Sequence, residues 1–266
     1  MRHSRGFTLL EVMLAAGLMA GLIIVVLDLL PDIFRTGRQE DTSQRLNWEA
    51  RRLLDRIQSD IRTAGFRFLP PITTDGQGNP VAAIAGDTTS LTLRGIVAVG
   101  ELAQPVASGD TQAFINGFNN LRNADFLIWT NNGLGGCRRL TAIAAGGGQV
   151  TVEPAGFPTA LPAGTLVAAV RTVTYTLQNG LLSRRVNGAG GAVAEVEQYG
   201  VDPAVTSFQY LVNTTPPQLL NTLPANLNNL IAVHINLRMV RNVNLPGGSH
   251  TAISTTIQER VSPLNL

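Results

Sequence analysis

The chain begins with a short basic segment and continues as an almost unbroken run of apolar side chains from Val12 to Leu27. Together with the residues around it, this run forms a segment of 24 residues from Phe7 to Leu30. A helix needs roughly 20 residues to cross the hydrocarbon layer, so the pattern predicts one membrane-spanning helix. Gly17 and Gly21 form a G-x-x-x-G pair within it. Such a pair is typical of close helix packing in membranes, although glycine is also enriched in spanning helices generally.

The pattern then becomes that of an amphipathic helix. Apolar residues recur at spacings of three and four, whereas most charged residues fall between them, which predicts one buried helix face. The recurring positions are Leu46, Ala50, Leu53, Leu54, Ile57, Ile61 and Ala64. Pro31 cannot donate to the carbonyl of Leu27, so we expect a kink or local unwinding there. Gly65 offers a left-handed cap, and Pro70-Pro71 prevents the helix from resuming.

Beyond Pro71 the periodicity changes to short β runs separated by turn residues. Asn179-Gly180 is the strongest hairpin signal, because both residues tolerate positive φ. Gly146-Gly147-Gly148 predicts a second hairpin loop. Strands are predicted at 90–99, 125–130, 138–144, 149–153, 167–178, 181–186, 193–199, 206–212, 230–240 and 252–261. One long helix followed by a mostly antiparallel sheet is an α+β arrangement.

One carboxylate, Glu11, lies within the apolar amino-terminal segment. An ionised glutamate in hydrocarbon is costly unless it faces a partner, so its presence indicates a function. The string Arg5-Gly6-Phe7-Thr8-Leu9-Leu10-Glu11 follows a short basic leader and resembles the class III signal of the type IV pilin superfamily. An ordinary secretory signal would place its cleavage site after the apolar stretch. The simpler alternative is a single-span membrane protein in which Glu11 lies at the headgroup boundary.

The resemblance implies that a prepilin peptidase cuts after Gly6 and methylates the new amino terminus at Phe7. The apolar segment is then retained as an anchor, and Glu11 becomes the partner of a methylated amine. The implied parts are a leader at 1–6, a transmembrane and filament-core helix at 7–30, the amphipathic second half of the helix at 31–65, and a β-rich globular domain at 66–266. The implied fold is type IV pilin-like, with one long kinked helix packed on the sheet. In related pilins a proline usually occupies the position of Asp28, so Pro31 departs from the pattern by three residues.

Three downstream segments narrow the resemblance. They are Ile-Arg-Thr-Ala-Gly-Phe at 61–66, Tyr-Thr-Leu-Gln-Asn-Gly-Leu-Leu-Ser-Arg-Arg at 175–185 and Val-Thr-Ser-Phe-Gln-Tyr at 205–210. In order and spacing they resemble the W class of type IV minor pilins (the PilW family), and they are also similar to the J class of type II secretion pseudopilins. The first resemblance implies a structural subunit that helps to prime pilus assembly and serves twitching, adhesion or DNA uptake through the filament.

The implied partners are the prepilin peptidase, other major and minor pilins through the amino-terminal helix, the inner-membrane assembly platform and the inner membrane itself. The implied location is a single pass through the inner membrane before assembly and the cell surface or pilus afterwards. One alternative function is that of a J-type pseudopilin of a type II secretion system. A second is that of a pilus-associated adhesin or DNA-binding receptor, with nucleic acid as the partner.

Charge gives no overall argument for binding nucleic acid. Loss of Arg2 and Arg5 with the leader leaves 18 basic side chains, which equals the 18 acidic ones. Such a neutral protein lacks the charge excess that attracts a phosphate backbone. Arg138-Arg139 and Arg184-Arg185 are adjacent pairs, but neighbours in a strand point to opposite faces, so neither pair makes a patch by itself. The sole cysteine, Cys137, excludes an internal disulfide. It is most simply a buried small hydrophobe, and an intermolecular disulfide is the alternative.

Residues for catalysis or metal binding do not occur at the required spacings. His234 and His250 have no cysteine or histidine at ligand spacing. The run from Gly247 to His250 lacks the G-x-S-x-G nucleophile elbow. Asp75 to Asn79 departs from the calcium-loop pattern and is better interpreted as a turn. The sequence therefore predicts a structural and interaction protein with no enzymatic activity, no cofactor and no metal.

Overall fold

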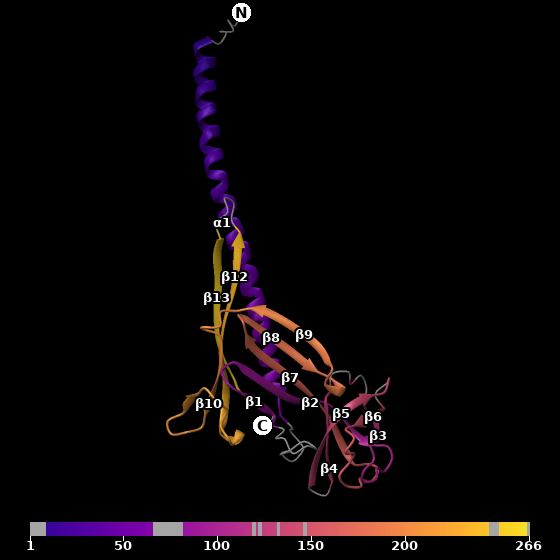
Figure 1. Ribbon diagram of the computed structural model, residues 1–266. Coiled ribbons are helices and arrows are strands. Elements are labelled where there is room, and N and C mark those ends of the chain that lie inside the picture. The colour runs from indigo at the N-terminus through magenta and orange to yellow at the C-terminus, as the bar shows by residue number, and fades with distance from the viewer. Residues whose placement is uncertain are drawn as a thin grey trace, which may run out of the picture. The chain divides into compact units, whose positions relative to one another are not determined.

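A computed structural model of the chain describes residues 9–65, 82–118, 121, 124–131, 134–145, 148–244 and 250–264. The fold is α+β, as predicted, with one long amino-terminal helix and large antiparallel sheets (Figure 1). Its elements are α1 (Leu9–Thr63), β1 (Ile84–Gly86), β2 (Ser90–Leu102), β3 (Gln112–Asn116), β4 (Phe126–Asn131), β5 (Leu134–Ile143), β6 (Gln149–Val152), β7 (Leu166–Gln178), β8 (Leu181–Asn187), η1 (Ala189–Gly191), β9 (Val193–Gly200), β10 (Ser207–Val212), β11 (Gln218–Leu220), η2 (Leu227–Asn229), β12 (Leu230–Asn244) and β13 (His250–Val261).

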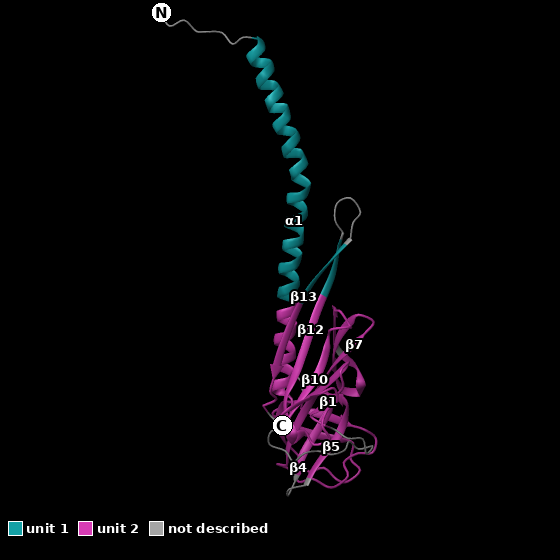
Figure 2. Cartoon of the chain, turned by 90° about the vertical axis from the view of Figure 1, so that its left-hand side faces the viewer, with its two compact units in different colours: residues 1–49, 240–255 teal, residues 50–239, 256–266 magenta. Residues whose placement is uncertain are grey.

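The chain divides into two compact units (Figure 2). The first unit contains residues 1–49 and 240–255, and the second contains residues 50–239 and 256–266. Within the first unit, Arg241 of β12 pairs with Glu49 of α1 through an Nη2–Oε2 distance of 2.9 Å. Thr255 of β13 donates a hydrogen bond of 2.5 Å to the Oδ1 of Asn47. These two contacts hold β12 and β13 against α1.

The helix α1 is α-helical over 55 residues and contains Pro31 without a break. The local unwinding expected at Pro31 is therefore not observed: proline removes one hydrogen bond, and the helical residues on both sides continue the helix. A bend there stays a prediction. The end of the helix also differs from the expected left-handed cap. Gly65 has the expected positive φ, at 125°, but it donates its N–H to the Arg94 carbonyl at 2.8 Å rather than to a carbonyl of the helix.

Nine strands form the larger sheet in the order β1-β2-β3-β6-β5-β4-β7-β8-β9, and β2 also pairs with β7. The smaller sheet has the order β11-β10-β12-β13. Ten strand predictions are confirmed with small shifts of their ends, whereas β1, β3 and β11 were not predicted. These three strands have only 3, 5 and 3 residues, too few to show a clear alternation.

The predicted hairpin at Asn179-Gly180 is confirmed. Both residues have positive φ, at 53° and 73°, and Gln178 pairs with Leu181 across the two-residue turn. β5 and β6 also pair antiparallel, and the Ala144 N–H donates to the Gln149 carbonyl at 2.9 Å. The expected loop residues Gly146 and Gly147 lie outside the described residues.

The buried face of α1 is the one that its apolar periodicity predicts. Each of its seven recurring residues has 5% or less of its surface exposed: Leu46, Ala50, Leu53, Leu54, Ile57, Ile61 and Ala64. The helix thus packs its second half on the antiparallel sheet and leaves its first half uncovered. Burial of such a stripe provides most of the stability of a helix in a folded protein.

Strand β4 separates two hydrophobic clusters, because its alternate side chains point to opposite faces. Leu127 and Trp129 belong to one cluster, in which the ring of Trp129 lies 5.1 Å from that of Phe157. Phe126 and Ile128 belong to the other. Cys137 is in this second cluster and is 3% exposed, which confirms its interpretation as a buried small hydrophobe.

Asp125, the residue before β4, is a buried carboxylate with 5% of its surface exposed. Burial raises the pKa of this carboxyl from 3.8 to about 6, because desolvation disfavours the charged form. A pKa that is higher in the folded state means that the folded protein binds the proton more tightly. The resulting stabilisation is complete below pH 3.8 and is lost as the pH rises through about 6.

We expect Asp125→Asn to raise the free energy of unfolding by about 1–3 kcal/mol at pH 8, because one pKa unit corresponds to about 1.4 kcal/mol. The difference from the wild type should shrink towards zero near pH 4, where Asp125 is protonated. Denaturant titrations of the full-length protein in detergent, followed by the fluorescence of buried Trp129, measure it. The Asp55→Asn variant, which removes an exposed carboxylate, is the control. If the free energies of unfolding of Asp125→Asn and the wild type differed by the same amount at every pH, this would contradict the raised pKa of Asp125.

The close approach of α1 to β2 gives a second expectation. A Cβ atom on Gly95 would collide with the carbonyl oxygen of Thr63, at the last residue of the helix. Gly95→Ala should therefore lower the free energy of unfolding by about 1–3 kcal/mol, the usual cost of overpacking. Gly148→Ala is a matched control, because its nearest atom would be 4.0 Å away. Equal unfolding midpoints for the two variants would contradict the proposed contact.

Candidate functional site: an exposed apolar helix and a buried ionic cluster

The first half of α1 is apolar on all sides, and residues 9–29 are all exposed. An 18-residue window within α1 has a mean hydropathy of 2.5, and none of that window is buried. In length and composition the helix is able to cross a membrane, and among the described residues it is the one helix with this property. A helix that is apolar all round and has no protein covering it requires lipid or other protein around it. This is compatible with a single-pass membrane anchor.

The residues predicted to function in this segment are partly described. Glu11 lies exposed in the first turn of α1, surrounded by leucine, valine and methionine side chains that are also exposed. Gly17 and Gly21 lie one turn apart, and no atom comes within 4 Å of a Cβ built on either one. The helix surface at these two glycines is therefore open to a close neighbour. Gly6 and Phe7, the predicted cleavage and methylation site, lie outside the described residues.

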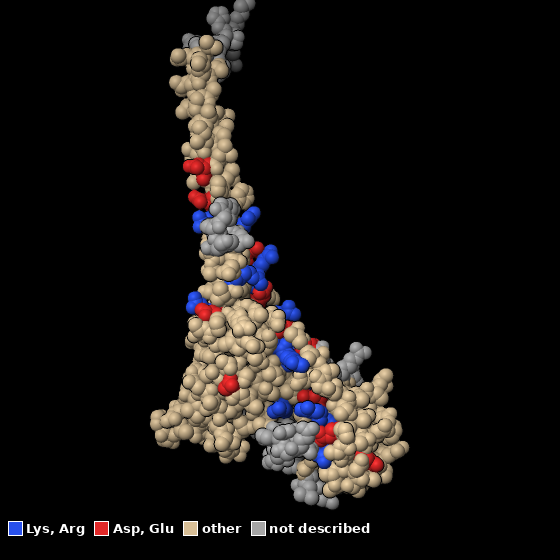
Figure 3. Space-filling view, in the orientation of Figure 1, with Lys and Arg blue, Asp and Glu red and all other residues tan. Residues whose placement is uncertain are grey.

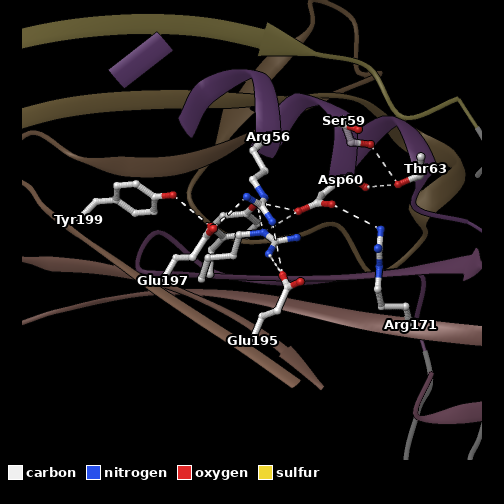
Figure 4. Close-up of polar contacts among 10 residues, drawn as sticks. Arg56, Ser59, Asp60, Thr63, Arg171, Glu195, Glu197 and Tyr199 are labelled. Carbon is white, nitrogen blue, oxygen red and sulfur yellow. Dashed lines mark hydrogen bonds and ion pairs between the residues drawn. The ribbon is translucent and has the colours of Figure 1, made fainter. Parts of the chain in front are cut away.

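A second arrangement, which the sequence analysis missed, surrounds Asp60 in the last turns of α1 (Figure 4). The Asp60 carboxylate is 7% exposed. Tyr175 of β7 donates its hydroxyl to Oδ2 at 2.7 Å, and Arg184 of β8 donates Nε–H to the same oxygen at 3.0 Å. Arg171 Nη2 lies 3.6 Å from Oδ1. Donors from two strands therefore converge on one helix carboxylate.

The network extends to β9 through Arg56, one turn before Asp60. Arg56 Nη1 lies 2.8 Å from Glu197 Oε1, and its Nη2 lies 3.3 Å from Glu195 Oε2. Arg184 Nη1 also reaches Glu195 Oε2 at 3.1 Å. Tyr199 donates its hydroxyl to Glu197 Oε2 at 3.0 Å. Figure 4 shows Arg56 on the helix and Glu195, Glu197 and Tyr199 on the strand pointing towards one another.

Local geometry explains why these residues meet. Arg56 and Asp60 are four residues apart and therefore lie on the same side of the helix. Tyr175 pairs with Arg184, and Arg184 with Glu197, in the register of β7, β8 and β9. Directly opposed residues in a sheet share a face, so these side chains all point towards α1. Glu195 joins them because alternate residues of β9 share that face.

The ionisation of the cluster is fixed by its surroundings. Burial raises the pKa of the Tyr175 hydroxyl, and the charge of Asp60 raises it further, so Tyr175 remains a hydrogen-bond donor. Burial lowers the pKa of the Arg184 guanidinium, but its hydrogen bonds and charge interactions with Asp60 and Tyr175 together outweigh this effect, and the net shift of the pKa is upward. A cavity beside Asp60 and Arg171 has a volume of about 10 Å³, space for no more than one water. The cluster therefore holds elements together and does not enclose a substrate.

The adjacent arginine pairs behave as the strand alternation predicts. Arg184 is 2% exposed, whereas Arg185 is exposed. Arg138 donates Nε–H to the Gly156 carbonyl at 2.6 Å, and Arg139 lies over the Phe126 ring at 5.4 Å from its centroid. Neither pair forms a basic patch by itself.

The two candidate histidines lie in separate strands, His234 in β12 opposite Gln209 and His250 at the start of β13. Within the described part of the chain, no group of three histidine, cysteine or acidic residues could hold a metal ion.

A double-mutant cycle tests whether Asp60 and Arg184 act as a pair. Asp60→Leu leaves the Arg184 charge buried without its closest carboxylate and should lower the free energy of unfolding by about 3–5 kcal/mol. Adding Arg184→Met removes that charge and should recover most of the loss. Asp41→Asn breaks the exposed Asp41–Arg45 pair and should cost less than about 1 kcal/mol. Denaturant unfolding measures the wild type, the two single cluster variants (Asp60→Leu and Arg184→Met), the double variant and the Asp41→Asn control, and additive effects of the two cluster substitutions would contradict the pairing.

No protein-family model, curated protein or solved structure matches this chain. The architecture itself, a long apolar amino-terminal helix packed on an antiparallel sheet, is compatible with a type IV pilin-like fold.

Proposed function

We propose that this protein is a minor pilin of the W class, a structural subunit that is incorporated into a type IV pilus and helps to prime its assembly. The observation that carries the proposal is the division of one helix between two environments. Residues 9–29 of α1 are exposed and, apart from Glu11 and Asp28, carry no charge, whereas the same helix buries Leu53, Ile57 and Ile61 in its second half. Such a helix joins a soluble domain to an apolar medium without a linker.

The apolar surface of α1 is surrounded first by lipid and later by other pilin helices. Before assembly it crosses the inner membrane, and after extraction it packs with the helices of other pilins in the filament core. At 1.5 Å per residue, the 55 residues of α1 extend for roughly 80 Å. Gly17 and Gly21 allow backbones to approach closely in either surrounding, because they place no side chain between them.

Maturation supplies the partner of Glu11 in this proposal. The prepilin peptidase removes residues 1–6 and methylates Phe7, which leaves a cationic amine at the start of the apolar helix. In the filament core, the Glu11 carboxylate neutralises the amine of a neighbouring subunit. An unpaired charge in such surroundings is expensive, so the pair favours one register of adjacent subunits. The inner-membrane assembly platform then moves the subunit out of the membrane.

The buried cluster supports this function mechanically. A subunit pulled by its helix must transmit the load to its globular domain. Asp60 and Arg56 bind the end of α1 to β7, β8 and β9, and the Gly65 N–H bonds to the Arg94 carbonyl next to Gly95. These contacts oppose sliding of the helix along the sheet, so the helix and the domain move together.

A J-type pseudopilin of a type II secretion system is the alternative that the same architecture supports. Neighbouring genes distinguish the two, because a retraction ATPase accompanies a pilus and a secretin with secretion partners accompanies a pseudopilus. A DNA-binding receptor or adhesin receives less support from the surface. Figure 3 shows basic and acidic side chains interleaved on the visible face, and Arg56, Arg138, Arg184 and Arg241 are each paired with a glutamate.

The proposed function predicts separate effects of two substitutions. Glu11→Ala should be cleaved normally and remain in the membrane but enter sheared pili several-fold less, because the amine of its neighbour loses its counter-charge. Gly6→Val should instead retain the leader, because a side chain blocks the peptidase. Mass spectrometry of the amino terminus and immunoblots of pilus and membrane fractions measure both effects. Undiminished entry of Glu11→Ala into pili would remove the charge-pairing mechanism, and a wild-type protein absent from pili would contradict the function.

A further inference from the structure

Six strands of the larger sheet close into a barrel. β2, β3, β6, β5, β4 and β7 pair in that order, and β7 pairs back with β2. Figure 1 shows β3, β4, β5 and β6 gathered in one part of the globular domain. All six strands contribute side chains to the hydrophobic cluster of Trp129 and Phe157. The barrel therefore encloses an apolar core of its own, and its closure depends on each pairing around the ring.

Asp125 lies where β4 begins to pair with β7. Its N–H donates to the Val170 carbonyl of β7 at 2.9 Å, and its carbonyl accepts the Leu140 N–H of β5 at 2.8 Å. Four residue pairs hold β4 to β7, whereas β7 makes eleven pairs with β2 and six with β8. The β4–β7 pairing is therefore the smallest that β7 makes, and Asp125 is next to its first pair.

The carboxyl group of Asp125 is buried with incomplete compensation. It is 5% exposed, and its Oδ1 has no hydrogen-bond partner among the residues that the structure describes. The Oγ1 of Thr172 on β7, close enough to lower the pKa of this carboxyl, likewise has no partner there. The guanidinium groups of Arg94 on β2 and Arg139 on β5 lie over the Phe126 ring, 6.0 and 5.4 Å from its centroid. Their charges also favour the ionised form, but desolvation is the larger effect and raises the pKa to about 6.

Separation of β4 from β7 at this end would bring water to the Asp125 carboxyl. Hydration favours the charged form, so an open barrel end returns the pKa of the carboxyl towards 3.8, whereas the closed end holds it at about 6. The closed form therefore binds the proton more tightly. The opening equilibrium rises as the pH increases from 3.8 to about 6 and then levels off. A difference of about two pKa units corresponds to about a hundredfold change in this equilibrium.

We propose that Asp125 makes the β4–β7 pairing a pH-sensitive closure of the barrel, which acid keeps closed and neutral pH loosens. The neutral carboxyl is compatible with the buried position between β2, β5 and β7. The ionised carboxylate favours separation of the first β4–β7 pairs, which leaves the edges of both strands unpaired. The acidity around the globular domain thus sets how tightly the barrel is closed. The inference is independent of the proposed function, because every group in it belongs to the barrel.

Hydrogen–deuterium exchange of the full-length protein in detergent tests the closure. Mass spectrometry follows the exchange from about pH 4 to about pH 8, with correction for the chemical exchange rate at each pH. Peptides that cover residues 124–131 should lose protection by up to about a hundredfold over this range, most of it below about pH 6. Peptides that cover β8 should not follow this change, because β8 lies outside the barrel.

Three variants identify the group responsible. Asp125→Asn has nearly the same shape without the charge, so residues 124–131 should keep their acid protection at every pH. Thr172→Val removes a hydroxyl that lowers the pKa of Asp125 and should extend the loss of protection to higher pH. Glu101→Gln removes an exposed carboxylate from β2 of the same barrel and should match the wild type. The wild-type pH profile in Asp125→Asn, or an equal loss of protection in β8, would overturn the proposal.

Discussion

The desolvation of Asp60 is the constraint on which the arrangement of helix and sheet depends. A carboxylate with 7% exposure is stable only where hydrogen-bond donors compensate for lost water. Tyr175 and Arg184 provide these donors at 2.7 and 3.0 Å, and they come from adjacent, directly opposed positions of β7 and β8. The register of the two strands and the rotation of the helix are therefore coupled through one side chain. Apolar burial alone allows the helix to slide along the sheet, whereas this pairing specifies one position.

The sheet also has a central element, since β7 pairs with β2, β4 and β8. Its run from Val167 to Val170 is completely buried, so it is apolar at consecutive positions rather than at alternate ones. Further along the same strand, Tyr175 faces α1 and joins the ionic network. One end of β7 therefore packs in the apolar core, and the other end makes the polar contact that specifies the position of the helix.

Surface chemistry separates the two halves of α1. The first half exposes apolar side chains on every side, and the second exposes charged residues on the side away from the sheet. Trp48 breaks this rule in the polar half. It is a single exposed apolar residue, which needs no special explanation.

Local patterns in the sequence determined the elements of this protein. The apolar run, the three-and-four spacing from Leu46 to Ala64 and the Asn179-Gly180 turn each depend on residues close in the chain, so the membrane-length helix, its buried face and the hairpin were predictable. The small strands β1 and β3 were not, because runs of 3 and 5 residues are too short to show a clear alternation. The Asp60 cluster was also missed, although a carboxylate beside Ile57 and Ile61 on an apolar face was a visible signal.

Gly65 and Pro31 show, at single residues, how far local structure could be predicted from the sequence. The sequence indicated that a helix ends near Gly65, but only the neighbouring Arg94 carbonyl decided that its N–H would bond to β2. Pro31 removes one hydrogen bond wherever it occurs, yet the surrounding helix continued through it. The sequence by itself determined which segments become helix or strand and which helix half is apolar. The tertiary structure alone decided which distant charges meet, because a buried ion pair depends on strand register and helix rotation.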